Sequence, residues 1–221
     1  MKSLYDSYCF DASKRITKSY STSFYVGVKC LDKKIRKDIH AVYGLVRFAD
    51  EIVDSFHDYN KEELLSEFKE ATFLAIERGI SLNPILNSFQ STVNKYKIDK
   101  QLIDQFFYSM EMDLNPVKYD QSKYDEYILG SAKVVGLMCL KIFVYGNEKE
   151  YEKLKPYAMY LGSAFQKINF LRDLKSDIDN LGRIYFPNLN TNNLSNQDKE
   201  SIEKEIELEF IEAKKGIKLL P

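Results

Sequence analysis

The sequence predicts an all-α protein, and three observations support this prediction. Apolar residues recur at three- and four-residue spacing through the long segments, which is the period of an amphipathic helix. Nine Gly and five Pro occur in 221 residues, so the turns that a many-stranded sheet needs are scarce. A hydrophobic content of 44% can fill one substantial core, and we expect a single domain over residues 1–221.

The helix boundaries follow from the apolar period and from the residues that interrupt it. Asn83-Pro84 and Asn115-Pro116 mark turns, because Pro is favoured at the start of a helix and disfavoured within it. One long irregular stretch is expected over residues 180–193. The predicted helices span residues 5–20, 33–57, 61–79, 83–96, 99–114, 121–145, 149–179 and 195–219.

Composition narrows the expected partners and compartment. The formal net charge is -1, which gives no electrostatic reason to expect a nucleic acid as a partner. Cys9, Cys30 and Cys139 have neither the spacing of a zinc site nor that of a disulfide framework, which fits a reduced cytoplasm. No segment approaches the roughly 20 apolar residues of a membrane span. We therefore expect a cytoplasmic protein that contacts a membrane only peripherally, if at all, and leave its oligomeric state open.

The predicted helix 33–57 carries two parallel stripes of side chains. The apolar stripe consists of Ile35, Ile39, Val42, Val46, Ala49 and Val53. One position further along, with the same spacing, lies a polar stripe of Tyr43, Arg47, Asp50 and Asp54. At about 100° per residue the polar stripe borders the buried face. Asp50 and Asp54 are one turn apart, close enough to share a cation.

The predicted helix 149–179 repeats this arrangement. Its apolar stripe consists of Leu161, Ala164, Ile168 and Leu171. Its polar stripe consists of Gly162, Gln166, Asn169, Asp173 and Asp177. If the two helices face each other, four carboxylates converge, which is electrostatically costly without cations. A ligand set made only of oxygen atoms suits Mg²⁺, whose coordination is usually completed by water and substrate phosphates.

A solvated helix face is the alternative interpretation of each Asp pair. Two Asp residues four positions apart often occur by chance in a sequence with 29% charged residues, and for either motif alone this interpretation is the stronger one. Two such pairs in one chain favour a metal site over a solvated face. Each pair has an Arg at the adjacent turn, Arg47 or Arg172, and each borders an apolar stripe. The sequence therefore predicts a divalent-cation site.

The motifs resemble those of the squalene/phytoene synthase family, the head-to-head trans-isoprenyl diphosphate synthases. The stretch "YSTSFYVGVKCLDKKIRKDIHAVYGLVRFADEIVD" is similar to the N-terminal region of that family through its first Asp-rich motif. The stretch "YILGSAKVVGLMCLKIF" resembles the central substrate-lining helix, and "LGSAFQKINFLRDLKSDIDNLGRIYFP" the second Asp-rich motif. The resemblance runs from Ser21 to Pro187, and "STSF", "MEMDL" and "GRIYFP" are most like bacterial phytoene synthases. It implies an isoprenoid synthase-type helical bundle with a central cavity.

The resemblance also implies roles for single residues. The implied ligands of Mg²⁺, or of Mn²⁺ in its place, are Asp50, Asp54, Asp173 and Asp177. The residues implied to act on the reacting groups are Tyr43, Arg47, Tyr127, Gln166, Asn169 and Arg172. Those implied to bind the substrate are Ser21, Ser23, Phe24, Arg183 and Tyr185. Ser21 and Ser23 match a flap that precedes the first Asp-rich motif of the family. Some relatives carry Lys between these two serines, whereas this chain has Thr22.

The implied function is that of a phytoene synthase, which joins two geranylgeranyl diphosphates without a reductant, so NADPH is not expected. A squalene or dehydrosqualene synthase using farnesyl diphosphate is the alternative within the same chemistry. A catalytically silent assembly protein is the alternative outside it, and two intact Asp pairs favour the enzyme. A di-metal carboxylate bundle would need Glu-x-x-His, and neither His40 nor His57 completes that motif. Members of the family usually continue beyond "KKGIKLLP", so we expect a truncated form or a short variant.

Overall fold

The computed structural model describes residues 1–114, 119–187 and 196–221. None of the described residues lies in a β-strand, so the predicted all-α fold class is confirmed. The chain divides into two compact units, which we treat separately. Unit 1 consists of Met1–Asp99 with Lys141–Asn147, and unit 2 consists of Lys100–Leu140 with Glu148–Pro221.

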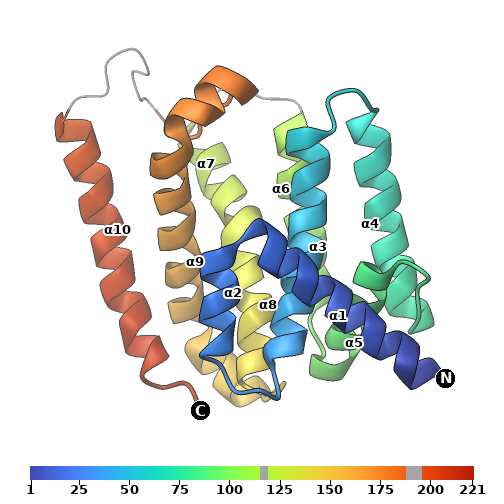
Figure 1. Ribbon diagram of the computed structural model, residues 1–221. Coiled ribbons are helices and arrows are strands. Elements are labelled where there is room, and N and C mark those ends of the chain that lie inside the picture. The colour runs from blue at the N-terminus through green and yellow to red at the C-terminus, as the bar shows by residue number, and fades with distance from the viewer. Residues whose placement is uncertain (115–118, 188–195) are drawn as a thin grey trace. The chain divides into compact units, whose positions relative to one another are not determined.

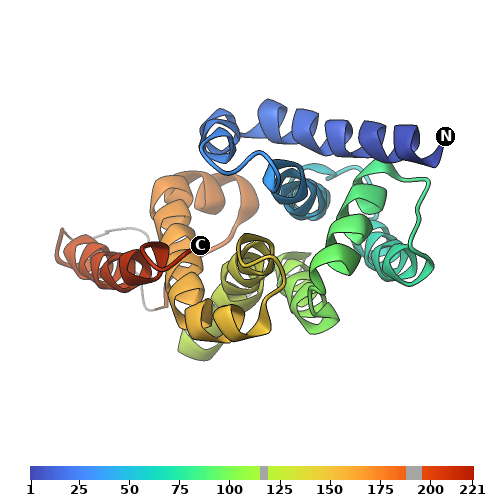
Figure 2. The same cartoon turned by 90° about the horizontal axis from the view of Figure 1, so that it is seen from below.

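Unit 1 is built from five helices and the end of a sixth. The five are α1 (Lys2–Tyr20), α2 (Thr22–Lys29), α3 (Arg36–Ser55), α4 (Lys61–Arg78) and α5 (Pro84–Tyr96). Helix α1 packs across α3 and α5, and α4 packs against α3 and α5 (Figures 1 and 2). The apolar stripe predicted for α3 faces this core: its members are buried except Val46, which is half-buried.

Local sequence explains where most of these helices begin and end. The side chains of Asn60 and Asn83 accept hydrogen bonds from backbone N–H groups in the first turns of α4 and α5. Gly79 ends α4 with a φ of 69°, a conformation that costs glycine little. Helix α2 was not predicted. The Oγ of Ser21, whose backbone is extended, accepts from Phe24 N at 3.3 Å and so starts a new helix directly after α1.

A buried carboxylate joins α3 to α5. Asp38 is 0% exposed, and its Oδ2 accepts from Tyr96 Oη at 2.8 Å and from Lys95 Nζ at 2.9 Å. Thr92 Oγ1 donates to Asp38 Oδ1 at 3.4 Å. Because a buried charge is tolerated only when it is well paired, these contacts hold α3 at a defined position against α5. The polar stripe of α3 is positioned by the same packing.

His40, on the buried side of α3, is expected to make unit 1 sensitive to acid. Burial, with a smaller contribution from the charge of Lys14, lowers the pKa of His40 from 6.5 to about 4. Its Nδ1 lies 3.0 Å from Thr17 Oγ1, and that hydroxyl already donates to Ser13 O, so Nδ1 carries the hydrogen and donates. The lowered pKa keeps the ring neutral at pH 7. The unfolded chain binds the extra proton between pH 6.5 and pH 4, so the free energy of unfolding falls as the pH falls through this window.

Because of His40, the free energy of unfolding is expected to fall by about 2 kcal/mol between pH 7 and pH 5. Urea unfolding at the two pH values measures it. The control His57→Gln changes the exposed histidine and should keep the loss, whereas His40→Gln should remove it. An equal loss in the His40→Gln chain would contradict this assignment.

Unit 2 contains helices α6 to α10 and two π-helical segments. Its elements are α6 (Lys100–Leu114), α7 (Gln121–Ile128), η1 (Leu129–Lys133), α8 (Val134–Phe143, to Leu140 in this unit), α9 (Glu148–Ser176), η2 (Asp177–Leu181) and α10 (Asn196–Ile217). The helix predicted over 121–145 is thus divided by η1, and the one predicted over 149–179 ends in η2. The Asn115-Pro116 turn and residues 188–195 lie outside the described residues.

Close backbone packing surrounds η1. A Cβ atom on Gly130 would lie 2.4 Å from the carbonyl oxygen of Gln105 on α6. A Cβ atom on Gly162 of α9 would lie 2.7 Å from the carbonyl oxygen of Ala132. Both glycines are therefore required by the close approach of α6 and α9 to η1, which no sequence period could show.

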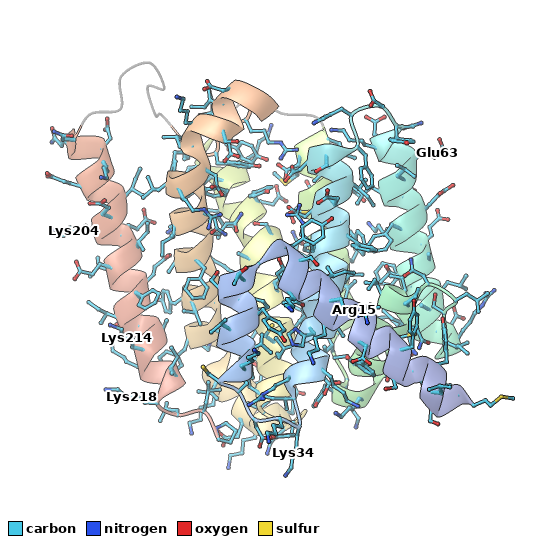
Figure 3. The ribbon with its side chains drawn as sticks, in the orientation of Figure 1. Arg15, Lys34, Glu63, Lys204, Lys214 and Lys218 are labelled. Atoms are coloured by element: carbon cyan, nitrogen blue, oxygen red, sulfur yellow. The ribbon has the colours of Figure 1, made fainter. Side chains whose placement is uncertain are left out.

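An ion cluster attaches α10 to α9, and the two helices lie side by side (Figures 1 and 2). Lys167 of α9 is 4% exposed, and its Nζ donates to Glu209 Oε1 at 2.8 Å and to Glu205. Ser163 Oγ donates to the same Glu209 oxygen at 2.8 Å. The side chains of Lys204, Lys214 and Lys218 are exposed along α10 and its C-terminal end (Figure 3).

We expect Lys167→Met to lower the free energy of unfolding by about 2 kcal/mol, because Glu209 loses its buried cation. The expected loss is below that of a fully buried pair, since Glu205 is 56% exposed and can turn to water. Urea unfolding measures the change. The matched control Lys204→Met removes an exposed lysine from α10 and should change the free energy by no more than about 0.5 kcal/mol. Equal stability of the two variants would contradict a stabilising role for the cluster.

Candidate functional site

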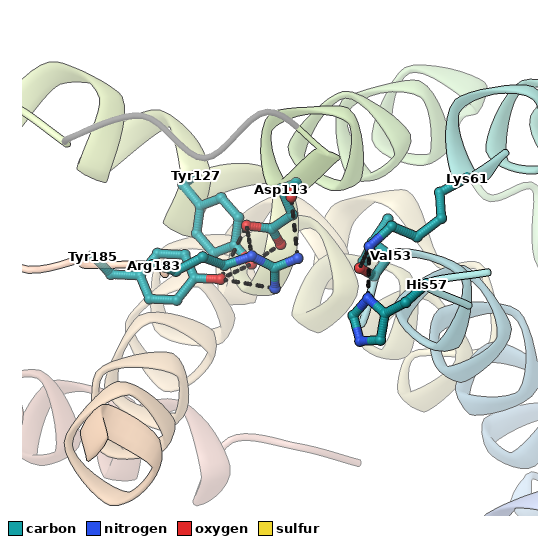
Figure 4. A network of polar contacts seen from close by, with 7 residues as sticks. All are labelled: Val53, His57, Lys61, Asp113, Tyr127, Arg183 and Tyr185. Carbon is teal, nitrogen blue, oxygen red and sulfur yellow. Dashed lines mark hydrogen bonds and ion pairs between the residues drawn. The ribbon is translucent and has the colours of Figure 1, made fainter. Parts of the chain in front are cut away.

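The first group of candidate site residues is the polar stripe of α3, in unit 1. Asp50 and Asp54 lie one turn apart, and both are half-buried. Arg47 Nη1 donates to Asp50 Oδ2 at 2.6 Å, and Arg47 Nη2 donates to Glu51. Lys61 of α4 contacts the last turn of α3, where its Nζ donates to Val53 O at 2.9 Å (Figure 4). The helix thus presents an arginine and two aspartates at its C-terminal end.

Aromatic rings line the same stripe. The Tyr43 ring stacks on Phe24 of α2, with ring centroids 5.0 Å apart and an interplanar angle of 22°. Burial raises the pKa of Tyr43, so its hydroxyl stays protonated at neutral pH. Ser21 caps α2, and Ser23 is exposed on it. The structure therefore brings Ser21, Phe24 and Tyr43 together beside Arg47.

The second group of candidate site residues lies on α9 and η2, in unit 2. Gln166, Asn169, Asp173 and Asp177 follow one another at helical spacing and are all half-buried. Arg172 Nε and Nη2 donate to the two oxygens of Asp173 at 2.8 Å and 2.5 Å. This bidentate pair, with a further contribution from Asp177, outweighs burial and raises the pKa of Arg172.

The apolar stripe predicted for α9 is only partly buried. Ala164 is 0% exposed, but Ile168 is 39% exposed. The buried side chains of α9 are Tyr151, Leu154, Ser163, Ala164, Lys167 and Phe170. The prediction failed because the buried face runs through Ser163, Lys167 and Phe170, and hydrophobic periodicity assigns a charged residue such as Lys167 to the surface.

Unit 2 also contains a buried polar cluster of Asp113, Tyr127, Arg183 and Tyr185 (Figure 4). Asp113 of α6 is 4% exposed, and its carboxylate accepts from Tyr127 Oη at 2.5 Å and from Tyr185 Oη at 2.9 Å. Arg183 is 5% exposed, with Nε 3.7 Å from Asp113 Oδ1 and Nη2 donating to Asp113 O at 3.1 Å. Asp113 thus joins three of the predicted site residues, Tyr127, Arg183 and Tyr185.

Aromatic rings pack around this cluster and bury it. The Tyr185 ring stacks on Phe170 of α9, with centroids 4.3 Å apart, and the Tyr119 and Tyr127 rings lie within 5.6 Å of each other. Burial and the neighbouring Asp113 carboxylate raise the pKa of Tyr127 and of Tyr185 well above 10. Both hydroxyls therefore remain protonated donors at any physiological pH.

Asp113 is not among the predicted site residues, although the sequence carries a signal for it. Ile103, Phe106, Met110 and Asp113 step by three, four and three along α6, and all four are buried. A carboxylate in register with an apolar stripe must find donors in the core. Applied to α6, that rule would have selected Asp113.

The fit of a divalent cation rests on the chemistry of the donor set. Among the described residues, no group of three or more His, Cys, Asp or Glu side chains is assembled into a metal site. The polar stripe of α3 and that of α9 and η2 each present a pair of aspartates to which water has access. Two carboxylates, with water and substrate phosphate as the remaining ligands, are a usual Mg²⁺ environment. The residues fit Mg²⁺ bound together with a phosphate-bearing ligand.

These features place the molecule in a class of proteins: all-α folds in which Asp pairs on separate helices, each with an adjacent Arg, suit a cation and a phosphate group. The chain belongs to the squalene/phytoene synthase family, whose sequence pattern matches residues 17–206. The family predicted from the motifs is thereby confirmed.

Relatives of known name are moderately similar. Phytoene synthase 1 of Arabidopsis thaliana is 28% identical over 184 residues, which are 80% of this chain and 43% of the relative. Presqualene diphosphate synthase of Rhodopseudomonas palustris is 28% identical over 170 residues, 75% of this chain and 58% of the relative. Phytoene synthase of Mycobacterium tuberculosis is 29% identical over 184 residues, 79% and 56% respectively. The chain thus spans about half the length of these relatives.

Solved structures share the fold. A dehydrosqualene synthase crystallised with a ligand superposes with a TM-score of 0.86 at 22% identity, covering 98% of this chain and 79% of that one. A squalene synthase from Alicyclobacillus acidocaldarius superposes with a TM-score of 0.82 at 20% identity, covering 96% and 84%. The isoprenoid synthase-type helical fold is therefore confirmed. No helix among the described residues has the length and apolar character needed to cross a membrane.

Proposed function

We propose that this chain catalyses the head-to-head condensation of two geranylgeranyl diphosphates to phytoene, by way of a cyclopropylcarbinyl diphosphate. The observation that carries the proposal is the repeated arrangement of an aspartate pair and an adjacent arginine, Arg47 with Asp50 on α3 and Arg172 with Asp173 on α9. The bacterial and plant relatives named phytoene synthase support this choice of product.

In the proposed site Asp50, Asp54, Asp173 and Asp177 would hold Mg²⁺. When bound, Mg²⁺ would neutralise the diphosphate as it departs from the allylic carbon. Arg47 and Arg172 would each add fixed positive charge beside a diphosphate group. Departure of the first diphosphate leaves an allylic cation, and the C2–C3 double bond of the second substrate attacks it to close the three-membered ring, with loss of a proton.

The second ionisation, a rearrangement and a further proton loss then yield the hydrocarbon. The side chains proposed to face the cations are Tyr43, Tyr127, Gln166 and Asn169. Aromatic faces and amide oxygens stabilise carbocations without bonding to them. Tyr127 is held by Asp113 and by its aromatic neighbours, so its ring would keep a fixed orientation through both steps. Ser21, Ser23 and Phe24 would contact the substrate from α2.

A squalene or dehydrosqualene synthase using farnesyl diphosphate is the second candidate. The presqualene diphosphate synthase relative and the two superposed structures favour it. The chemistry up to the cyclopropylcarbinyl diphosphate is the same, so the two candidates differ in donor length. Only squalene formation also needs a reductant, because phytoene and dehydrosqualene both form by proton loss from the second carbocation.

Product analysis distinguishes the candidates. The purified chain is incubated with Mg²⁺ and either geranylgeranyl or farnesyl diphosphate, with and without NADPH, and the extracted hydrocarbon is identified by mass spectrometry. A C40 product from the longer donor without NADPH is the expected result. A C30 product from farnesyl diphosphate would support the second candidate, and no product from either donor would contradict both.

A further inference from the structure

Arg47 is held on three sides within unit 1. Its Nη1 donates to Asp50 Oδ2 at 2.6 Å, and its Nη2 donates to Glu51 Oε2. Its Cζ lies 4.4 Å from the centroid of the Tyr20 ring at the end of α1, which is cation–π range. Only one of these three contacts, that with Asp50, involves the aspartate pair.

Arg172, on α9 in unit 2, is held differently. Its guanidinium makes a bidentate pair with Asp173, and its side chain is 66% exposed, against 26% for Arg47. Among the described residues Asp173 accepts both hydrogen bonds of this guanidinium, and Asp177 contributes a further attraction without accepting one from Arg172. A cation on Asp173 would therefore take the acceptor of Arg172, whereas a cation on Asp50 would leave Arg47 with two contacts.

This difference matters because a carboxylate oxygen bound to a divalent cation is no longer a full acceptor for a guanidinium. Were Asp50 the sole anchor of Arg47, the arginine and the cation would compete for one carboxylate. Glu51 removes that competition, because its side chain is 20% exposed and holds the second nitrogen of the same guanidinium. The Nε of Arg47 is also buried without a hydrogen-bond acceptor among the described residues, so it retains a donor for one.

We propose that Glu51 is a positioning residue: it retains Arg47 beside the aspartate pair when Asp50 turns to the cation, so that Arg47 can donate to a diphosphate oxygen. The identity of the anion rests on the proposed function. Glu51 acts through Arg47 and does not itself bind the cation. Tyr20 supports the same guanidinium from its face.

Four full-length chains test the inference: wild type, Glu51→Gln, Arg47→Gln and the double variant. The affinity for Mn²⁺ is measured from the electron paramagnetic resonance signal of the free ion. The affinity for inorganic pyrophosphate at fixed Mg²⁺ is measured by calorimetry. The matched control Glu70→Gln removes an exposed glutamate of α4 in the same unit and should match the wild type. Urea unfolding confirms that each variant is folded.

We expect Glu51→Gln to weaken pyrophosphate binding about tenfold, and Mn²⁺ binding about threefold because Arg47 then competes for Asp50. In the Arg47→Gln background, Glu51→Gln should change neither affinity further. An unchanged pyrophosphate affinity in Glu51→Gln would overturn the inference. So would an equal loss of Mn²⁺ affinity in both backgrounds, since Glu51 would then be a cation ligand. If the wild type forms a hydrocarbon product, these two contradicting results overturn the role of Glu51 and leave the proposed function intact. A wild type that binds neither Mn²⁺ nor pyrophosphate overturns the role of Glu51 and the proposed function together.

Discussion

Asp50→Asn and Asp173→Asn should each lower turnover about a thousandfold, with the fold unchanged. Each substitution removes one negative charge from a proposed cation ligand while keeping the shape of the side chain, and a loss of about 4 kcal/mol of transition-state stabilisation corresponds to that factor. Both carboxylates are partly exposed, so the free energy of unfolding should change by less than about 1 kcal/mol. Steady-state assays of hydrocarbon formation, with urea unfolding alongside, measure the two quantities.

The control for this prediction is Asp11→Asn, which removes an exposed aspartate of α1 and should leave turnover at the wild-type level. Unchanged turnover in both Asp50→Asn and Asp173→Asn would rule out the cation site. Loss in one variant alone would limit the site to that helix. The experiment also tests whether the two units act together, since each Asp pair lies in a different unit.

Asp113→Asn should lower the free energy of unfolding by about 3 kcal/mol, because buried Arg183 then loses its carboxylate partner. The substitution also places an amide donor against Tyr127 and Tyr185, whose hydroxyls both donate to Asp113. Urea unfolding of the full chain gives the change.

Two further comparisons make this second prediction specific. Tyr185→Phe removes one donor and leaves the charges paired, so it should lower the free energy of unfolding by about 1 kcal/mol. Asp125→Asn, on the exposed side of α7, should change it by no more than about 0.5 kcal/mol. If Asp113→Asn were as stable as Asp125→Asn, the cluster would not stabilise unit 2.

Most helices could be predicted from the sequence because their signals are local. The helices predicted over 61–79, 83–96 and 99–114 agree with α4, α5 and α6 to within one residue at each end. Asparagine caps, a proline in the first turn and a closing glycine specify α4 and α5 without help from the rest of the chain.

The failures share a different physical cause. Helix α2 is only eight residues long, too short for an apolar period to show, and its start depends on the single hydrogen bond that Ser21 accepts. The π-helical segment η1 divides the helix predicted over 121–145, where Gly130 and Gly162 allow neighbouring backbones to approach closely. Neither feature changes the hydrophobic period, so neither could be seen in it.

The sequence by itself determined the fold class, the family and the two aspartate pairs, because helical periodicity places residues three and four apart on one face whatever surrounds the helix. Only the tertiary structure decided which side chains share a buried environment. Asp113 meets Tyr185 across 72 positions of the chain, and Lys167 meets Glu209 across 42. Contacts between such distant residues depend on how helices pack, and the packing also decided that α9 buries Lys167 and leaves Ile168 of the predicted apolar stripe exposed.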